Sequence, residues 1–188
     1  MAMNKGKIVA VFGGSRVEER TPAWDEAYRA GRLLAEAGFI VMNGGYDGAM
    51  TAVSKGACEA GGHVVGVTCD LFSRLRPNPW LTEERRTATL YERLTVMTRE
   101  ADGFLALRGS IGTLSELTLA WSLIYTGALP PRPLVLLGES YRRLLEALAE
   151  TTYLRPEERS LVQVVNTVAE AVAALRAPAR WQARDLRG

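Results

Sequence analysis

Short apolar runs alternate along this chain with segments whose apolar positions recur every three or four residues. The runs at 7–12, 39–42 and 63–67 have the length of buried strands. Each of the first two runs is followed by a glycine-rich loop and then by a segment with helical spacing. Strand, loop and helix repeated in succession predict parallel βαβ units.

The same alternation continues to residue 175. Thr21 and Pro22 predict the N-cap and first position of a helix that ends near residue 37, with Gly38 as its C′ residue. The other expected helices cover residues 50–60, 91–101, 141–149 and 167–175, with one more carrying Leu114, Leu117, Trp121 and Ile124. The other expected strands are residues 86–90, 103–107, 134–137 and 163–165.

One stretch between these elements has no periodic pattern. Residues 69–82 contain Pro77 and Pro79, so we expect an irregular segment that covers or borders a site. The helix after this segment is expected to have an apolar inner face made of Leu90, Leu94, Met97 and Ala101.

The order of these elements predicts an α/β fold. We expect a single-domain, Rossmann-like, doubly wound sheet that is mostly parallel, with helices on both faces. Residues 1–188 would form one nucleotide-binding domain, with its core at about 7–175. The Ala/Arg-rich tail at 176–188, which includes Trp181, is expected to be a peripheral segment or a partner contact.

Composition narrows the class of protein. Apolar residues make up 47% of the chain and charged residues 23%, and the net charge is +2. These are ordinary globular values. The chain has no basic block with interleaved aromatics, so we expect no nucleic-acid partner, and no apolar run approaches the ~18 residues of a membrane span. Residues 1–6 are polar and lead straight into a strand, so we expect no signal peptide.

Few side chains suit metal or covalent chemistry. The chain has two cysteines, Cys58 and Cys69, and one histidine, His63. We therefore expect reduced thiols in a cytoplasmic protein, no metal site, and a structural or surface role for the histidine. None of the few lysines has a pocket-like context, which disfavours the pyridoxal-phosphate chemistry of amino-acid decarboxylases.

Three glycine-rich loops follow three of the expected strands. Their candidate phosphate-binding residues are Gly13 and Ser15, then Gly44, Gly45 and Gly48, and lastly Arg108, Gly109, Ser110, Gly112 and Thr113. The carboxyl ends of parallel strands share one edge, so we expect the loops to converge on one crevice. Their backbone N–H groups and a helix N-terminus favour an anion, which predicts a nucleotide or sugar phosphate. The alternative is that each glycine only serves a turn with positive φ.

The second loop partly resembles the glycine pattern of dinucleotide-binding proteins. Gly44, Gly45 and Gly48 partly match G-x-G-x-x-G, but the first two glycines are adjacent. This spacing favours a mononucleotide over NAD.

Glu116 allows two interpretations. The pattern Thr113-x-x-Glu116 matches a capping box, which would contribute about 1 kcal/mol to helix stability. Alternatively, a carboxylate one helical turn from a bound phosphate can orient water or stabilise an oxocarbenium-like centre, as in glycoside chemistry.

Arg93 also allows two interpretations. It is either a solvated helix arginine, paired with Glu92 or Glu100, or a group that reaches the site. Arg99 and Arg108 are rival candidates. Arg108 stands at the mouth of the third glycine loop, where a guanidinium can hold a phosphate.

Two stretches resemble motifs of a known family. Residues 104–116 resemble the PGGxGTxxE motif of the LONELY GUY family, cytokinin-activating phosphoribohydrolases long mislabelled as lysine decarboxylases. Residues 43–50 resemble the GGGxxGLM loop of the same family. The resemblance extends over about 7–175.

The resemblance also implies which residues are catalytic. The family's helix signature MHxRK aligns with residues 90–94, which matches Arg93 to the family's catalytic arginine. The first motif matches Glu116 to its catalytic glutamate. The chain departs from the first motif at two positions, with Arg108 where the motif has proline and Ser110 where it has glycine. It departs from the helix signature with Leu94 in place of lysine and Leu90-Tyr91 in place of Met-His.

By this resemblance the protein hydrolyses the N-glycosidic bond of a purine or cytokinin nucleoside 5′-monophosphate. The products are the free base and ribose 5-phosphate, and no metal or organic cofactor is implied. The family also implies a homodimer or a larger homo-oligomer. The related molybdenum-cofactor carrier proteins share the fold and the glycine loops but bind without hydrolysis. A nucleotide or molybdenum-cofactor carrier without turnover is therefore the alternative.

Overall fold

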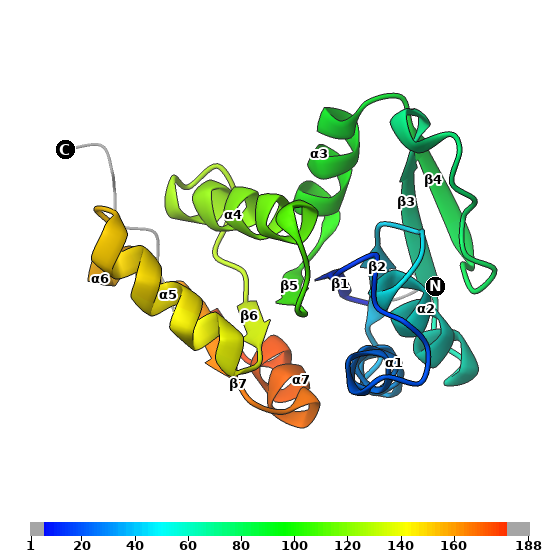
Figure 1. The fold of residues 1–188 in the computed structure, drawn as a ribbon, viewed down its shortest axis with the longest axis horizontal. Helices are drawn as coiled ribbons and strands as arrows, with labels where there is room; N and C mark the ends of the chain where they lie inside the picture. The colour runs from blue at the N-terminus through cyan, green and yellow to red at the C-terminus, as the bar shows by residue number, and fades with distance from the viewer. Residues whose placement is uncertain (1–5, 180–188) are drawn as a thin grey trace, which may run out of the picture.

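Seven parallel strands form one sheet in the computed structural model, which describes residues 6–179 (Figure 1). The strands are β1 (Ile8–Phe12), β2 (Ile40–Asn43), β3 (Val64–Cys69), β4 (Glu83–Thr87), β5 (Gly103–Ala106), β6 (Leu134–Leu137) and β7 (Val162–Val165). Their order across the sheet is β4-β3-β2-β1-β5-β6-β7. The predicted parallel α/β sheet is confirmed. The expected role of the tail around Trp181 falls outside the described residues.

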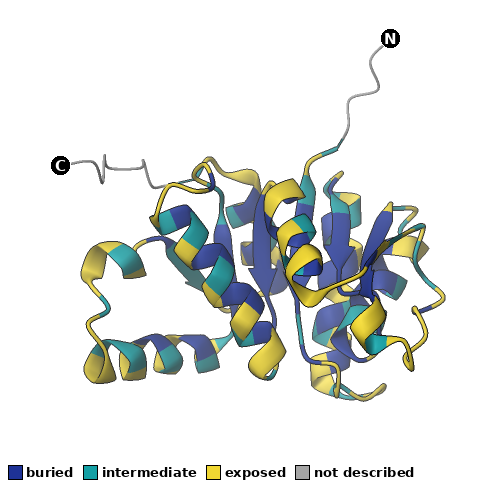
Figure 2. Cartoon of the chain, turned by 90° about the horizontal axis from the view of Figure 1, so that it is seen from above, coloured by how far each residue is buried: buried dark blue, intermediate teal, exposed yellow. Residues whose placement is uncertain are grey.

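Helices cover both faces of the sheet (Figure 1). They are α1 (Pro22–Glu36), α2 (Ala49–Glu59), α3 (Leu90–Glu100), α4 (Ile111–Tyr125), α5 (Glu139–Thr151), α6 (Pro156–Arg159) and α7 (Val168–Arg176). Side chains of β1 alternate between two cores. Val9 and Val11 pack with α1, α2 and α7, whereas Ala10 and Phe12 pack with α3, α4 and α5. In Figure 2 the strands are buried beneath helices whose outer faces are exposed. Within residues 6–179, no helix is both long and apolar enough to cross a membrane.

The first helix begins and ends where the sequence predicts. The Trp24 N–H donates to the Thr21 hydroxyl (3.3 Å), and Pro22 occupies the first helical turn, where a missing N–H costs nothing. Gly38 follows the helix with φ of +84°, the left-handed conformation expected of a C′ residue.

The edge strand β4 and the start of α3 differ from the prediction of a strand at 86–90. β4 is a polar strand that ends at Thr87, so an apolar pattern could not locate it. Thr89 then forms a capping box with Glu92, whose N–H donates to the Thr89 hydroxyl (3.2 Å). This cap starts α3 at Leu90.

The predicted inner face of α3 is partly wrong. Met97 and Ala101 are buried as expected, but Leu90 is 38% exposed. Arg93, three residues after Leu90, points toward the protein interior instead and is only 7% exposed. The short helix α6 was not part of the prediction, because four residues are too few to show a period.

The strand order creates a switch point at the centre of the sheet. β1 pairs with β2 on one side and with β5 on the other. The loop after β1 leads to α1 on one face, and the loop after β5 leads to α4 on the opposite face. A crevice opens between two such loops, and ligands of open α/β sheets bind there.

Candidate active site

The three glycine loops meet at the carboxyl edge of the sheet, as the sequence predicts. The Gly14 N–H donates to the Arg108 carbonyl (3.2 Å), which joins the loop after β1 to the loop after β5. The Ala49 N–H donates to the Gly14 carbonyl (2.9 Å), which joins the first loop to the second. Backbone hydrogen bonds thus join the three loops to one another at the switch point.

A cleft of about 430 Å³ lies between the first and third loops. This volume lies within the range of small-molecule sites. The lining residues are Gly14, Ser15, Arg16, Val17, Glu18, Thr21, Ala23, Arg108, Gly109 and Ser110. Four of the predicted phosphate-binding residues are therefore in the cleft wall, and Gly13 instead packs against Ala49 of α2.

The second loop lies beneath this surface rather than in the cleft wall. Gly44, Gly45 and Gly48 are all buried. Gly45 and Gly48 have positive φ of +78° and +68°. These values fit the alternative interpretation, in which the glycines only serve turns with positive φ. Gly44 serves a different purpose, because a Cβ there would lie 1.9 Å from Nη2 of Arg93. Its missing side chain makes room for the guanidinium.

The capping-box interpretation of Glu116 is wrong. Helix α4 begins at Ile111 with Ser110 as N-cap, so Thr113 is already the third helical residue. The Ser110 side chain forms no capping hydrogen bond. The N–H groups of the first turn are thus left to water or a ligand, and the positive end of the helix dipole lies beside the cleft.

Thr113 is a buried polar residue at this helix start. It is 3% exposed, and within residues 6–179 its hydroxyl has no hydrogen-bond partner. In that part of the chain no fully buried side-chain polar atom lacks a partner, so the hydroxyl reaches solvent. A Cβ on Gly109, a cleft residue, would lie 2.0 Å from this hydroxyl oxygen. The hydroxyl therefore lies immediately behind the third loop.

Arg93 and Glu116 form a buried ion pair between α3 and α4. Nη1 of Arg93 donates to Oε1 of Glu116 (3.0 Å), and Nε of Arg93 donates to the Val67 carbonyl at the end of β3 (2.8 Å). The two residues are 7% and 9% exposed. The alternative of a solvated Arg93 paired with Glu92 or Glu100 is wrong. Glu92 caps α3, and Glu100 pairs with Arg85.

The ion pair leaves one atom of each partner uncommitted. Oε2 of Glu116 and Nη2 of Arg93 form no hydrogen bond within the described part of the chain. Burial raises the pKa of Glu116 above 4.5, and the Arg93 guanidinium opposes this shift. The carboxyl group is thus held in one orientation with a free oxygen, six residues or ~9 Å along α4 from Ser110.

Sequence comparison assigns the chain to a family. A family model described as "Possible lysine decarboxylase" matches residues 50–175. The cytokinin riboside 5′-monophosphate phosphoribohydrolase of Rhodococcoides fascians is 32% identical over 182 residues, which cover 92% of this chain and 90% of that protein. The chain belongs to the LONELY GUY family. The enzyme of the same name from Mycobacterium tuberculosis is 33% identical over 155 residues, 79% of this chain and 82% of that one.

Solved structures support the same fold. The crystal structure of TM1055 has a TM-score of 0.69 and 35% identity, and covers 89% of this chain and 96% of its own. The molybdenum cofactor binding protein of Rippkaea orientalis has a TM-score of 0.72 and 21% identity, with 91% and 96% coverage. At that identity the second likeness supports the fold alone.

A buried polar network supports the second loop in this LONELY GUY protein. The Asn43 side chain accepts from the Gly45 N–H (2.8 Å) and donates to Ser54 (2.9 Å). Asn78, from the irregular segment, donates to Ser54 and to the Tyr46 carbonyl, each at 3.3 Å. The segment at 69–82 therefore packs against the second loop, and its expected position at the border of the site stays a prediction. Nothing in the spacing of these residues indicated that they would meet.

Tyr141 supports the third loop from below. Its hydroxyl donates to the Leu107 carbonyl (2.8 Å), and burial raises the pKa of Tyr141 to about 12. The phenol therefore stays protonated and a donor at neutral pH. It fixes the loop that leads to Gly109.

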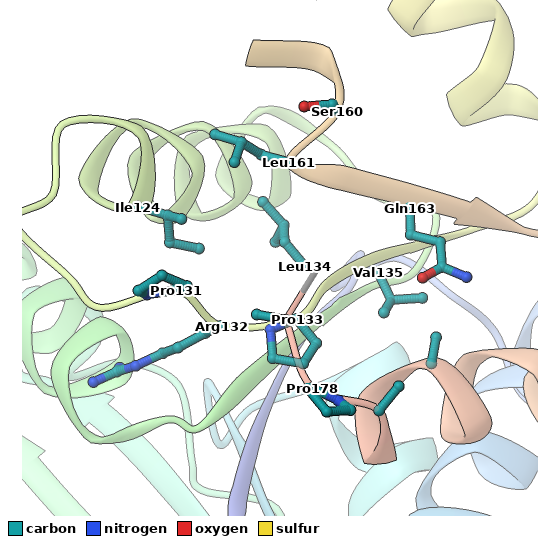
Figure 3. Close-up of a pocket in the computed structure, with 13 residues that line it drawn as sticks. Ile124, Pro131, Arg132, Pro133, Leu134, Val135, Ser160, Leu161, Gln163 and Pro178 are labelled. Atoms are coloured by element: carbon teal, nitrogen blue, oxygen red, sulfur yellow. The ribbon is translucent and has the colours of Figure 1, made fainter. Parts of the chain in front are cut away.

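Other features lie apart from the three loops. Figure 3 shows a cavity at the amino ends of β6 and β7, near Pro131, Leu134 and Leu161. Its volume of about 30 Å³ suits one water molecule rather than a nucleotide.

His63 lies at the surface beside Glu83 (3.2 Å), as expected. Among residues 6–179, no three His, Cys, Asp or Glu side chains are grouped to hold a metal.

Proposed function

We propose that this protein hydrolyses the N-glycosidic bond of a purine or cytokinin nucleoside 5′-monophosphate to the free base and ribose 5-phosphate. The observation that carries this proposal is the buried ion pair between Arg93 on α3 and Glu116 on α4, the helix whose N-terminus borders the cleft. The relatives from Rhodococcoides fascians and Mycobacterium tuberculosis, both named as cytokinin riboside 5′-monophosphate phosphoribohydrolases, support the same reaction.

The phosphate would bind at the start of α4. Gly109 and Ser110 line the cleft there, and the first-turn amides at Gly112 and Thr113 have no side-chain cap. The helix dipole and these N–H groups favour a dianion. Ser15 from the first loop lines the same cleft and would supply a hydroxyl.

The ribose would then extend along α4 toward Glu116. In the chemical step the C1′–N bond breaks, a C1′–O bond to water forms, and the base leaves with a proton. Positive charge develops at C1′, and the free carboxylate oxygen of Glu116 would stabilise it and orient the water. Arg93 would hold that carboxylate in place through Nη1, with Nη2 left for the substrate.

The reaction needs only a small-molecule substrate and water. We propose no metal, organic cofactor, nucleic-acid or membrane partner for it. The two free cysteines, Cys58 and Cys69, support a cytoplasmic location.

A homodimer is the proposed assembly. Tyr91 at the start of α3 and Ile111 at the start of α4 are 84% and 80% exposed. The exposed residues in the middle of α4 are small and uncharged, and half-buried leucines flank them: Ser115, Thr118 and Ser122, with Leu114, Leu119 and Leu123. Interfaces are depleted of charged residues at their centre, so a second copy would cover this uncharged face beside the site.

Base release from AMP tests the proposal. The purified protein is incubated with AMP and with its isopentenyl derivative, and free base is measured by chromatography. Adenosine, which lacks the phosphate, is the matched control. We expect release from both monophosphates and at least about tenfold less from adenosine, because the phosphate contacts hold the substrate. Binding of both monophosphates in calorimetry without release of either base would contradict hydrolysis and favour the carrier function.

A further inference from the structure

One buried hydroxyl beside the third loop has no part in the proposed reaction. Tyr141 lies in the first turn of α5 and is only 4% exposed. Its hydroxyl donates to the Leu107 carbonyl (2.8 Å), 34 residues earlier in the chain. This hydrogen bond connects α5 to the residue that leads into the third loop.

The peptide groups of Leu107 fix the start of that loop. β5 ends at Ala106, and the Leu107 N–H donates to the carbonyl of Phe12, the last residue of β1 (2.8 Å). Within residues 6–179, the Tyr141 hydroxyl is the only donor to the Leu107 carbonyl. Leu107 is 3% exposed, so the carbonyl is shielded from water that could replace the phenol.

The two halves of the candidate site depend on this hydrogen bond to different degrees. Leu107 is three residues before Ser110, the N-cap of α4, and Gly109 and Ser110 line the cleft. Without the phenol, a buried carbonyl is left unpaired, and the loop has to move to give it another partner. Glu116 lies six residues further along α4 and is held by Arg93, which also donates to the end of β3. A change at Leu107 should therefore displace the proposed phosphate contacts more than the carboxylate.

We propose that Tyr141 is a positioning residue whose hydrogen bond to the Leu107 carbonyl sets the preference of the site for a nucleoside 5′-monophosphate over the free nucleoside. This rests on the proposed function for the position of the phosphate at the start of α4. The phenol acts only through the loop, since its hydroxyl is committed to the Leu107 carbonyl. It should therefore affect the binding of the phosphate and leave the breaking of the C1′–N bond nearly unchanged.

The test compares Tyr141→Phe with the wild type in the full-length protein. The substitution keeps the ring and removes only the hydroxyl. The matched control is Tyr28→Phe, which removes another phenol that donates a hydrogen bond, to Glu59 between α1 and α2 (2.6 Å). Affinities for AMP and adenosine are measured by calorimetry, and kcat and KM for AMP by release of adenine.

We expect Tyr141→Phe to lower the ratio of AMP affinity to adenosine affinity about tenfold, because an unpaired buried carbonyl displaces the loop. The KM for AMP should rise by a similar factor, with kcat within about twofold of the wild type. Tyr28→Phe should leave the affinity ratio and KM unchanged. Both nucleosides are titrated into the same sample, so a fraction of unfolded protein does not alter the ratio.

Three results for Tyr141→Phe would overturn the proposal. One is an unchanged affinity ratio with a lower melting temperature, which would make the phenol merely structural. Another is an equal loss of affinity for AMP and adenosine. The third is a fall in kcat at an unchanged KM, which would place the effect on the chemical step. Failure of the proposed function gives a different result, because the wild type then releases no adenine while the affinity ratio still falls in Tyr141→Phe.

Discussion

At the scale of single residues, the proposed reaction depends on a carboxyl group whose charge is costly to bury. Glu116 is 9% exposed and has a single side-chain partner in the described residues, Nη1 of Arg93 (3.0 Å). Burial raises the pKa of Glu116 above 4.5, with the guanidinium opposing it. Such a group binds a proton more readily in the folded state than in the unfolded chain.

This shift makes a prediction about stability and pH. A carboxyl whose folded pKa lies above its unfolded value stabilises the fold less as pH rises between those two values. The free energy of unfolding of the wild type minus that of Glu116→Gln should therefore fall as pH rises from 4.5. Urea denaturation of both proteins across this range measures it. A difference that rises with pH would mean that the ion pair outweighs burial.

The sequence alone could not orient Arg93. Its partner Glu116 is 23 residues away, and its backbone acceptor Val67 is 26 residues away. Spacing along α3 favoured Leu90 as an inner residue, yet Leu90 is exposed. Glu116 was already a candidate from its position one turn from the third loop, but only the family motif favoured Arg93 over its rivals, since nothing in local periodicity distinguishes an inward arginine from a solvated one.

At the scale of elements, the loop after β2 and the helix α3 have to fit together. Gly44 lies against the Arg93 guanidinium, and a Cβ on Gly44 would lie 1.9 Å from Nη2. The same Cβ would lie 2.6 Å from the sulfur of Met50. Gly44, which the sequence suggested for phosphate binding, thus leaves the space that the Arg93 guanidinium occupies.

Gly44→Ala should displace Arg93 and lower the rate constant of base release about 10²-fold, because small misplacements of a positioned group have effects of that size. The control is Gly56→Ala, whose Cβ would lie 2.0 Å from the Tyr28 carbonyl oxygen, between α1 and α2. Gly56→Ala should lower stability without lowering the activity of the protein that remains folded. Equal specific activity in the two variants would show that Gly44 has no particular link to the reaction.

Element boundaries were predicted well where capping or breaking residues are local. Thr21, Pro22 and Gly38 bound α1 as expected. The predicted start of α4 was wrong. The sequence suggested Thr113 as the N-cap, but the N-cap is Ser110, three residues earlier. Both residues are plausible caps by type, and only the geometry of the loop after β5 decides between them.

At the scale of the whole molecule, the parallel sheet and the convergence of three loops followed from repeated strand–loop–helix units. The polar edge strand β4 and the network through Asn78 did not, since each depends on contacts between distant segments. The uncharged outer side of α4, which half-buried leucines flank, is the remaining feature at this scale, and it supports the proposed dimer.

Mass measurement tests the dimer. One chain has a mass of 20.5 kDa, and sedimentation should give twice that value for the wild type. Tyr91→Glu places a charge on the exposed face of α3 and should shift the equilibrium toward the monomer. Tyr153→Glu, at a fully exposed tyrosine after α5, is the control and should remain dimeric. A monomeric wild type would contradict the proposed assembly.

The most direct test of the central claim is to measure AMP binding and adenine release together for the wild type and for Glu116→Gln. The amide keeps the size of the side chain but removes its charge, so binding at the start of α4 should change little. Release should fall by about 10²–10⁴-fold, the range typical of a group acting in the transition state. Release by Glu116→Gln at the wild-type rate would contradict the account.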